Sequence, residues 1–367
     1  MLNLFQVNFP ASIVAVALLS CLLSYLMIIN RCGHAQLMAD NDLEGVQKMH
    51  HFPVPRVGGI AIYASLVLLW LLASHSSGAE WVSYLGKLLL AALPVFAGGL
   101  LEDLTKKISP RVRLSLAFLS ALLGILLLQA KIPNLDVFWL DPILANGPIL
   151  LIFTIFIVGG ATHSINIIDG FNGLASGVAM ILIAATGILA KQLGDETIFL
   201  LSLSMGMAVL GFFLLNFPLG KIFLGDGGAY LLGFWISTTL IMLVNRHPEV
   251  SVWFPAALLG YPMFETLFSV YRRRYFDRTR HNEPDNRHIH HLIHLIIGQG
   301  PGYGRLSLVV RNSLTSLPIW AAVTLFSYLC LALRDDTRAL MWLYLTGILT
   351  YKLSYRILKR WTAAGEA

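Results

Sequence analysis

The sequence predicts an all-α, polytopic integral membrane protein with about eleven transmembrane helices. Of its 367 residues, 56% are hydrophobic and 13% are charged, and the mean hydropathy is +0.71. Soluble domains carry about 25% charged residues, so this chain has roughly half the usual share. Such a composition excludes intrinsic disorder. The three cysteines, Cys21, Cys32 and Cys330, show no CxxC spacing and exclude a disulfide scaffold.

A helix that spans a bilayer needs about 20 mainly apolar residues. Eleven stretches approach this length, namely 11–30, 57–74, 85–101, 113–130, 149–165, 175–190, 198–215, 229–245, 252–271, 315–333 and 339–358. The first is not a cleavable signal peptide, because no basic segment precedes it and no Ala-x-Ala site follows it. With no repeat or linker to divide the chain, we expect residues 1–367 to form one membrane domain.

Lysine and arginine residues concentrate on one side of the predicted membrane. If the N-terminus lies outside, 20 of the 26 basic residues fall in inner loops and 6 in outer loops. The positive-inside rule therefore places the N-terminus outside and the C-terminus in the cytoplasm. This topology also explains the net charge of +6, which argues against nucleic-acid binding.

Five predicted cytoplasmic loops carry the unusual chemistry, near residues 31–56, 102–112, 166–174, 216–228 and 272–312. The first contains Lys48, His51 and Arg56, which suit an anionic ligand. A basic inner loop that ends in a Pro-Gly turn is the simpler interpretation of these residues taken alone.

The second loop begins with adjacent carboxylates, Glu102 and Asp103, at the end of an apolar helix. Acids are costly near lipid, and such a pair suits a divalent cation or a general base. The alternative is a solvated helix end that Lys106 and Lys107 neutralise.

The third and fourth loops combine single acids with glycines. The third loop, around Asp169, opens the next apolar stretch, so the free N–H groups of that helix could receive a phosphate. In the fourth loop, Asp226 lies among Gly225, Gly227 and Gly228, where the backbone could approach a metal-bound phosphate closely. A plain turn is the alternative in both places.

The fifth loop carries Arg287, His288, His290 and His291. The histidines could bind zinc or donate hydrogen bonds to a pyrophosphate. Zinc is the weaker interpretation, because neither a cysteine nor an HExxH pattern accompanies them. Acids for Mg²⁺ and basic groups for phosphates, gathered on one face, together predict phosphoryl transfer at a membrane surface.

Five motifs resemble those of the polyprenyl-phosphate N-acetylhexosamine-1-phosphate transferases, also called glycosyltransferase family 4. They occur in the family's order between residues of about 48 and 291. The motifs are Pro55-Arg-Val-Gly-Gly59, Gly99-Leu-Leu-Glu-Asp103, Asn166-Ile-Ile-Asp-Gly-Phe-Asn-Gly173, Phe223-Leu-Gly-Asp-Gly-Gly228 and His288-Ile-His-His291. The resemblance implies transfer of a sugar 1-phosphate from a UDP-N-acetylhexosamine to undecaprenyl phosphate, with release of UMP.

The resemblance also implies roles for individual residues. Glu102, Asp103, Asp169 and Asp226 form the expected catalytic set, with Asp226 and Asp103 as ligands of Mg²⁺ or, alternatively, Mn²⁺. The expected substrate-binding set is Lys48, His51, Arg56, Lys106, Asn166, Gly170, Phe171, Asn172, Phe223, Arg287, His288, His290 and His291. Within this set, the loop from Asn166 to Asn172 is expected to contact the nucleotide, and Phe223 to stack on uracil.

Two features bear on the branch within the family. The histidine pattern resembles the GlcNAc-1-phosphate branch, because the phospho-MurNAc-pentapeptide translocases usually show three consecutive histidines. The pair Glu102-Asp103 departs from the usual Asp-Asp, so the division of labour between the two acids stays open. In this respect the chain resembles relatives that start O-antigen or other surface-polysaccharide chains, which implies GlcNAc or a modified sugar such as a 6-deoxyhexosamine as donor.

The expected location is the bacterial inner membrane, with the active site facing the cytoplasm; whether the protein forms a homodimer stays open. The other classes considered are a transporter and a non-catalytic lipid-binding protein. A transporter should show charges at the membrane midplane, whereas Glu265, the clearest acid within a predicted span, lies near its inner end.

Overall fold

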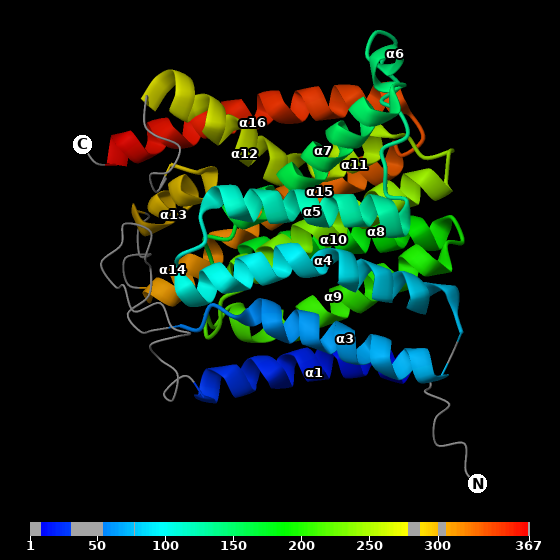
Figure 1. The fold of residues 1–367 in the computed structure, drawn as a ribbon. Coiled ribbons are helices and arrows are strands. Elements are labelled where there is room, and N and C mark those ends of the chain that lie inside the picture. The colour runs from blue at the N-terminus through cyan, green and yellow to red at the C-terminus, as the bar shows by residue number, and fades with distance from the viewer. Residues whose placement is uncertain (1–8, 31–53, 77, 278–286, 300–305, 366–367) are drawn as a thin grey trace.

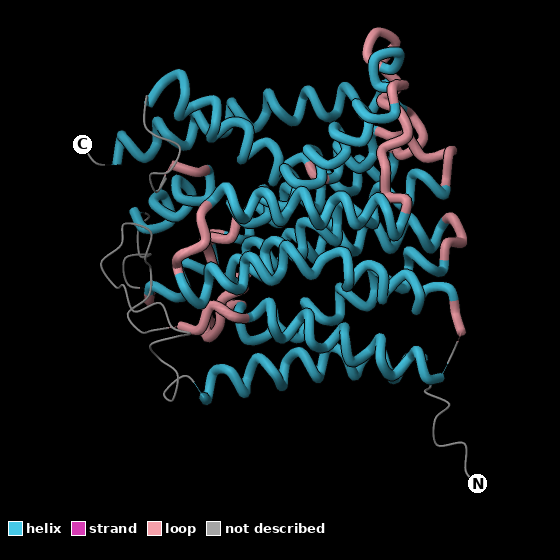
Figure 2. The backbone as a smooth tube through the Cα atoms, viewed as in Figure 1, coloured by secondary structure: helices cyan, strands magenta, loops and turns pink. Residues whose placement is uncertain are grey.

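The computed structural model describes residues 9–30, 54–76, 78–277, 287–299 and 306–365. Within these ranges the chain forms helices joined by short loops (Figure 2). In chain order they are α1 (Phe9–Ile29), α3 (Gly58–Ser76), α4 (Glu80–Thr105), α5 (Pro110–Leu128), α6 (Asp141–Leu144), α7 (Gly147–Ile167), α8 (Leu174–Gln192), α9 (Glu196–Asn216), α10 (Gly225–Arg246), α11 (Trp253–Leu258), α12 (Gly260–Arg272), the π-helix η2 (Arg273–Asp277), α13 (Ile289–Gln299), α14 (Leu308–Leu314), α15 (Ser316–Ala332) and α16 (Thr337–Gly365). The predicted all-α membrane class is confirmed.

Nine helical segments in the described ranges are long and apolar enough to cross a membrane, the last of them being the continuous pair α14 and α15. Two predicted spans differ. The stretch 252–271 is divided into α11 and α12, because Pro262 has no N–H to donate to the carbonyl of Leu258 one turn earlier. The stretch 339–358 lies in the more highly charged α16. The total of eleven spans stays a prediction.

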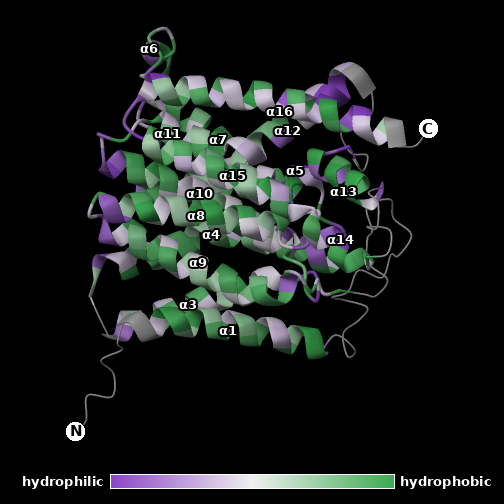
Figure 3. Ribbon diagram, turned by 180° about the vertical axis from the view of Figure 1, so that it is seen from behind, coloured by the Kyte–Doolittle hydropathy of each residue, from purple (hydrophilic) through white to green (hydrophobic). Residues whose placement is uncertain are grey.

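The helices run side by side, with α1 and α16 at opposite edges of the bundle (Figure 1). In that view α1 begins at the right and α16 ends at the left, as an odd number of crossings requires. Hydrophobic residues fill the middle of the helices and hydrophilic residues gather at both ends (Figure 3). This distribution is typical of a bundle with its middle in hydrocarbon and its ends in water.

The centre of the bundle is α10, whose membrane-spanning window is entirely buried. It packs against α3, α4, α5, α7, α8 and α9. Outer helices instead expose large apolar side chains; Leu18 of α1, for example, is 67% exposed. Because α10 has no lipid-facing side, the position of its first turn is set by its protein neighbours.

Three helices meet through glycines at the start of α10. A Cβ atom built on Gly99 of α4 would lie 2.5 Å from the backbone nitrogen of Gly227, and one built on Gly59 of α3 would lie 2.4 Å from that of Gly228. Small residues allow such close approach of membrane helices. This contact fixes Asp226, the residue just before the two glycines of α10, against α3 and α4.

We expect Gly99→Ala to lower the free energy of unfolding by about 1–3 kcal/mol, because the new methyl group has no space and must push α10 away from α4. The matched control is Gly160→Ala in α7, where an added Cβ meets no atom within 4 Å. The measurement is thermal unfolding of both purified variants in detergent. Equal stability of the two variants would contradict the tight contact.

Candidate active site

The described parts of the five predicted catalytic loops lie at the same end of the bundle, on the left in Figure 1. This end holds the last turns of α4 and α7 and the first turns of α3, α5, α8 and α10. Lys48 and His51 lie outside the described residues. The other predicted site residues lie within the described ranges.

Asp226 is the centre of the site, in the first turn of α10. One carboxylate oxygen, Oδ2, accepts a hydrogen bond from Arg113 Nη1 at 2.5 Å. The other, Oδ1, accepts one from Asn166 Nδ2 at 3.0 Å and lies 3.9 Å from Arg56 Nη2. The side chain is 13% exposed, so it is accessible from the end of the bundle. Asp226 thus joins the segment before α3 to α5 and α7 through two cations and one amide.

Asp103 is buried and caps α10 from the neighbouring helix α4. Its Oδ1 accepts the backbone N–H of Asp226 and its Oδ2 that of Gly227, each at 3.0 Å. These N–H groups belong to the first turn of a helix, where no carbonyl of the same helix can bind them, and the helix dipole favours an anion there. Gly225 leaves the necessary space, since a Cβ on it would lie 2.6 Å from Asp103 Oδ2.

Glu102 has a different environment from Asp103. Its Oε2 accepts the backbone N–H of Ile108 at 2.7 Å, which closes the turn between α4 and α5. Its charge also interacts with that of Arg113. Lys106 is the exposed C-cap residue of α4, with φ of 56°. The two adjacent acids therefore bind different parts of the chain: Glu102 binds the turn after α4, and Asp103 binds the start of α10.

Asp169 lies in the loop between α7 and α8 and interacts electrostatically with the other charges of the site. Burial raises the pKa of Asp169 to about 7. Arg56 acts to lower this pKa, whereas the negative charges of Asp226 and Asp103 raise it further. A carboxyl with this pKa can exchange a proton near neutral pH.

Phe171 and Asn172, from the same loop, face the protein interior. Phe171 is 5% exposed and packs with its ring 5.3 Å from that of His291. The N–H of Asn172 donates to Asn312 Oδ1 at 2.7 Å, and its carbonyl accepts from Ser316 Oγ at 2.8 Å. This geometry favours a role in holding the loop over direct contact with a nucleotide, so substrate contact by these two residues stays a prediction.

The two residues just before α8, Asn172 and Gly173, use their backbone N–H groups within the protein. The N–H of Gly173 donates to Asn216 Oδ1 at 2.8 Å, and that of Asn172 is also taken up within the protein. Asn216 in turn donates through Nδ2 to the carbonyl of Ile222 at 2.8 Å. These two N–H groups are therefore not open to a phosphate, because side-chain oxygens already accept them, whereas phosphate binding at the amides of α8 itself stays a prediction.

The segment around Phe223 pairs with the segment before α3. Phe223 donates its N–H to the carbonyl of Pro55 at 2.8 Å and accepts that of Gly58 at 2.9 Å. The short pairing places Arg56, between those two residues, beside Asp226. The Phe223 ring is half-buried, and stacking on a base stays a prediction.

The histidines of the fifth loop gather at the start of α13. The ring centroids of His290 and His291 are 4.6 Å apart, and His288 stacks on His290 at 5.2 Å, whereas Arg287 is exposed. Burial lowers the pKa of His290 well below its ordinary value, and the two neighbouring histidines lower it further, so His290 is neutral at pH 7. A Cβ on Gly170 would lie 3.3 Å from His290 Nε2, which places the cluster beside the Asp169 loop.

Three residues that the sequence analysis did not select belong to this site. Arg113 lies one turn into α5, after the Ser109 cap and Pro110, and turns inward while Arg111 is exposed. His163 and Tyr230 stack edge to face at 4.8 Å, and both interact electrostatically with Arg113 and Asp226. For His163, the sequence offered one signal, a titratable side chain inside the apolar stretch 149–165.

The acids fit Mg²⁺ only as an ion shared with substrate phosphates. Among the described residues, no group of three or more His, Cys, Asp or Glu side chains is arranged to hold a metal. Both oxygens of Asp103 already accept backbone N–H groups, which leaves Asp226 as the better placed ligand. Mg²⁺ is commonly held by one or two carboxylates together with phosphates and water.

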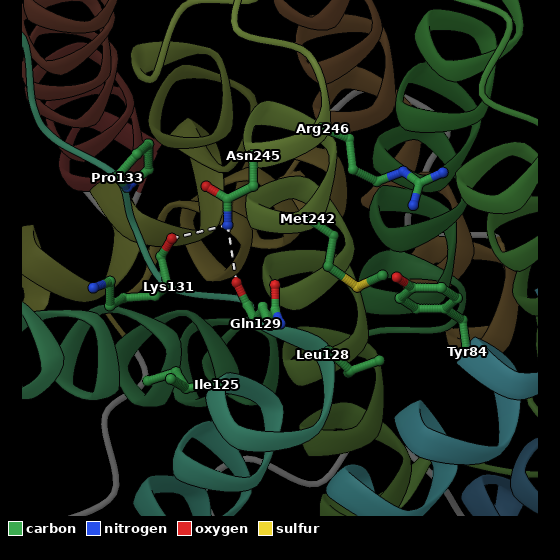
Figure 4. Close-up of a pocket in the computed structure, with 9 residues that line it drawn as sticks. All are labelled: Tyr84, Ile125, Leu128, Gln129, Lys131, Pro133, Met242, Asn245 and Arg246. Atoms are coloured by element: carbon green, nitrogen blue, oxygen red, sulfur yellow. Dashed lines mark hydrogen bonds between the residues drawn. The ribbon is translucent and has the colours of Figure 1, made fainter.

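A cavity of about 560 Å³ lies at the opposite end of the bundle and is not this site. It is lined by Tyr84, Ile125, Leu128, Gln129, Lys131, Pro133, Met242, Asn245 and Arg246 (Figure 4). Asn245 donates there to the carbonyls of Gln129 and Lys131. Arg246 is engaged by Asp195 at 2.6 Å, so its charge is already compensated.

Comparison with known proteins agrees with the motifs. Residues 85–244 match the model of glycosyl transferase family 4. A probable undecaprenyl-phosphate N-acetylglucosaminyl 1-phosphate transferase of Bacillus subtilis is 31% identical over 249 residues, which cover 67% of each chain.

Two further relatives are named undecaprenyl-phosphate alpha-N-acetylglucosaminyl 1-phosphate transferase. The protein of Yersinia pestis is 28% identical over 78% of this chain and 80% of its own length, and that of Thermotoga maritima is 26% identical over 69% and 72%. The predicted family and its GlcNAc-1-phosphate branch are confirmed. With its multi-pass helical bundle and its five motifs, the chain belongs to glycosyl transferase family 4.

Proposed function

We propose that the protein transfers an N-acetylhexosamine 1-phosphate from a UDP-sugar to undecaprenyl phosphate and releases UMP. The observation that carries the proposal is the cluster of Asp226, Arg113, Arg56 and Asn166 at the end of a membrane bundle. A reaction between a water-soluble nucleotide sugar and a membrane-bound lipid requires such a site at the membrane surface. The names of the relatives support the lipid acceptor and GlcNAc as the sugar.

The finer assignments extend this proposal. GlcNAc or a modified relative is the donor, and the product starts O-antigen or another surface polysaccharide. The excess of basic residues on one predicted side favours an inner-membrane protein whose site faces the cytoplasm. Transfer of phospho-MurNAc-pentapeptide is the second candidate, and the separated histidines at 288, 290 and 291 argue against it.

The proposed reaction is an in-line displacement at the β-phosphorus of the UDP-sugar. An oxygen of the lipid phosphate forms a new bond to this phosphorus. The bond from the phosphorus to the bridging oxygen then breaks, and UMP leaves with the electron pair. Arg56 and Arg113 are placed to stabilise the phosphates, since guanidinium groups match phosphate geometry. Asp226 would hold Mg²⁺, or alternatively Mn²⁺, which neutralises pyrophosphate charge when bound.

The proton of the lipid phosphate passes to Asp169 in this scheme. Asp103 is poorly suited to this task, because its two oxygens are committed to backbone amides. Asp169 has a pKa of about 7 and can accept a proton near neutral pH. Glu102 holds the neighbouring turn and interacts with Arg113.

Asp226→Asn should reduce Mg²⁺-dependent UMP release at least about 100-fold, because it removes the charge that binds both arginines and the metal. The assay uses purified protein in detergent with undecaprenyl phosphate and UDP-GlcNAc, with and without Mg²⁺. The control is Asp335→Asn, an exposed acid far along the chain from the site. Substantial turnover by a folded Asp226→Asn protein would rule out the assignment.

Asp103→Asn should lower thermal stability and activity together. An asparagine offers one acceptor oxygen, so one N–H of the α10 first turn loses its partner, at a cost of about 1–3 kcal/mol. Glu102→Gln keeps an oxygen for Ile108 and should unfold within about 0.5 kcal/mol of the natural protein. The comparison is contradicted if Asp103→Asn is as stable as Glu102→Gln.

The reaction rate should fall as the pH drops below about 7. Since the pKa of Asp169 is raised to about 7, the fraction of this carboxyl able to accept a proton decreases tenfold for each pH unit below that value. The measurement is kcat/KM between pH 5.5 and 9 at saturating Mg²⁺, and the Asp169→Asn variant should lose this limb of the profile. A rate that stays constant down to pH 6 speaks against Asp169 as proton acceptor.

A further inference from the structure

Glu265 is a buried acid that the proposed reaction does not use. It lies in α12 and is 1% exposed. Its Oε1 accepts a hydrogen bond from His288 Nδ1 at 2.9 Å and a second from the N–H of Ile289 at 3.3 Å. A carboxylate in such a place is costly unless it is paired and hydrogen-bonded. The partner that compensates this cost is one of the motif histidines.

The contact fixes the ring of His288 in one state. A carboxylate has no proton to donate, so Nδ1 of His288 must carry the hydrogen of this bond. A carboxylate that orients a histidine in this way sets both its tautomer and its direction.

The same oxygen also fixes the backbone on which the histidines lie. The carbonyl of His288 accepts the first helical hydrogen bonds of α13, from His291 at 3.0 Å and Leu292 at 3.2 Å. Glu265 accepts the N–H of Ile289, the first residue of that helix. The beginning of α13 is therefore held to α12 at the point where the cluster starts.

The orientation of His288 reaches the Asp169 loop through one ring. His288 and His290 are stacked, with centroids 5.2 Å apart and planes within 12°. His290 in turn lies against Gly170, and Phe171 meets both His290 and His291 edge to face. A change in the direction of His288 would consequently disturb the group beside Asp169.

We infer that Glu265 is a positioning residue of the transferase, which holds the ring of His288 in place and, through its stack on His290, the histidine group beside Asp169. The inference rests on the proposed function. The competing explanation is a buried polar pair that only joins α12 to α13. Tyr261 and Tyr351 also interact electrostatically with Glu265. These contacts would be the same if the pair were purely structural, so they do not distinguish the two explanations.

The experiment separates the two explanations with a double-mutant cycle. Glu265→Gln removes the charge that fixes the ring. In His288→Asn, the amide nitrogen takes the place of Nδ1 and keeps the bond to Glu265, but the ring that stacks on His290 is lost. Both variants and the double variant are assayed for UMP release as above, with kcat and KM measured separately and folding checked by thermal unfolding. Glu196→Gln, which breaks an exposed ion pair with Lys191, is the control and should behave like the natural protein.

We expect Glu265→Gln to lower kcat roughly ten- to a hundredfold, the range typical of carboxylates that orient a functional histidine. KM for the UDP-sugar should change little, because the interaction is used in the transition state. His288→Asn should show a loss at least as large although its bond to Glu265 is kept. In the His288→Asn protein, adding Glu265→Gln should cause no further loss of kcat, since no ring remains to be oriented.

Losses that add in the double variant, or full activity of either single variant, would overturn the inference. If Glu265→Gln does not fold, Glu265→Asp replaces it in the cycle, because it keeps the charge and withdraws the oxygen from His288. Absence of UMP release by the natural protein itself would instead refute the proposed function, so the two failures are distinguishable.

Discussion

The whole site depends on one interaction, the carboxylate of Asp103 that accepts the two backbone N–H groups at the start of α10. α10 is the central helix, and its first turn carries Asp226. The same turn is held by glycine contacts to α3 and α4. Asp226 binds Arg113, Arg56 and Asn166. The ends of α3, α4, α5 and α7 therefore meet at the start of α10, which Asp103 of α4 caps.

Two helices of the candidate site begin at a buried acid from a neighbouring helix. Asp103 caps α10 from α4, and Glu265 caps α13 from α12. In each case a buried acid accepts backbone amides at the start of a helix, next to a side chain to which the proposed function gives a role. Both acids are buried within the bundle, where an uncapped amide would be expensive. The acids in turn need the amides, because an unpaired charge would be expensive there too.

Much of the fold was predictable from the sequence, because hydropathy and helix length act locally. Every predicted apolar stretch falls on helix, and the five loops with acids and histidines share one end. The ninth predicted stretch is interrupted at residue 259, between α11 and α12, and Pro262 is the feature of the sequence that indicates this break. The site was harder, since its decisive contacts join distant residues. Nothing local distinguishes the capping Asp103 from Glu102, the inward Arg113 from the exposed Arg111, or the buried Asn172 from a nucleotide ligand.

The burial of α10 also has a consequence for how the protein is made. The helices that pack most extensively on it, α3, α4, α5, α7, α8 and α9, all precede it in the chain. When α10 leaves the ribosome, its partners have already been synthesised, and the slot it enters is lined by their side chains instead of lipid. Synthesis from the N-terminus therefore delivers the central helix after these six neighbours, and Asp226 meets Arg113, Arg56 and Asn166 only when that helix arrives.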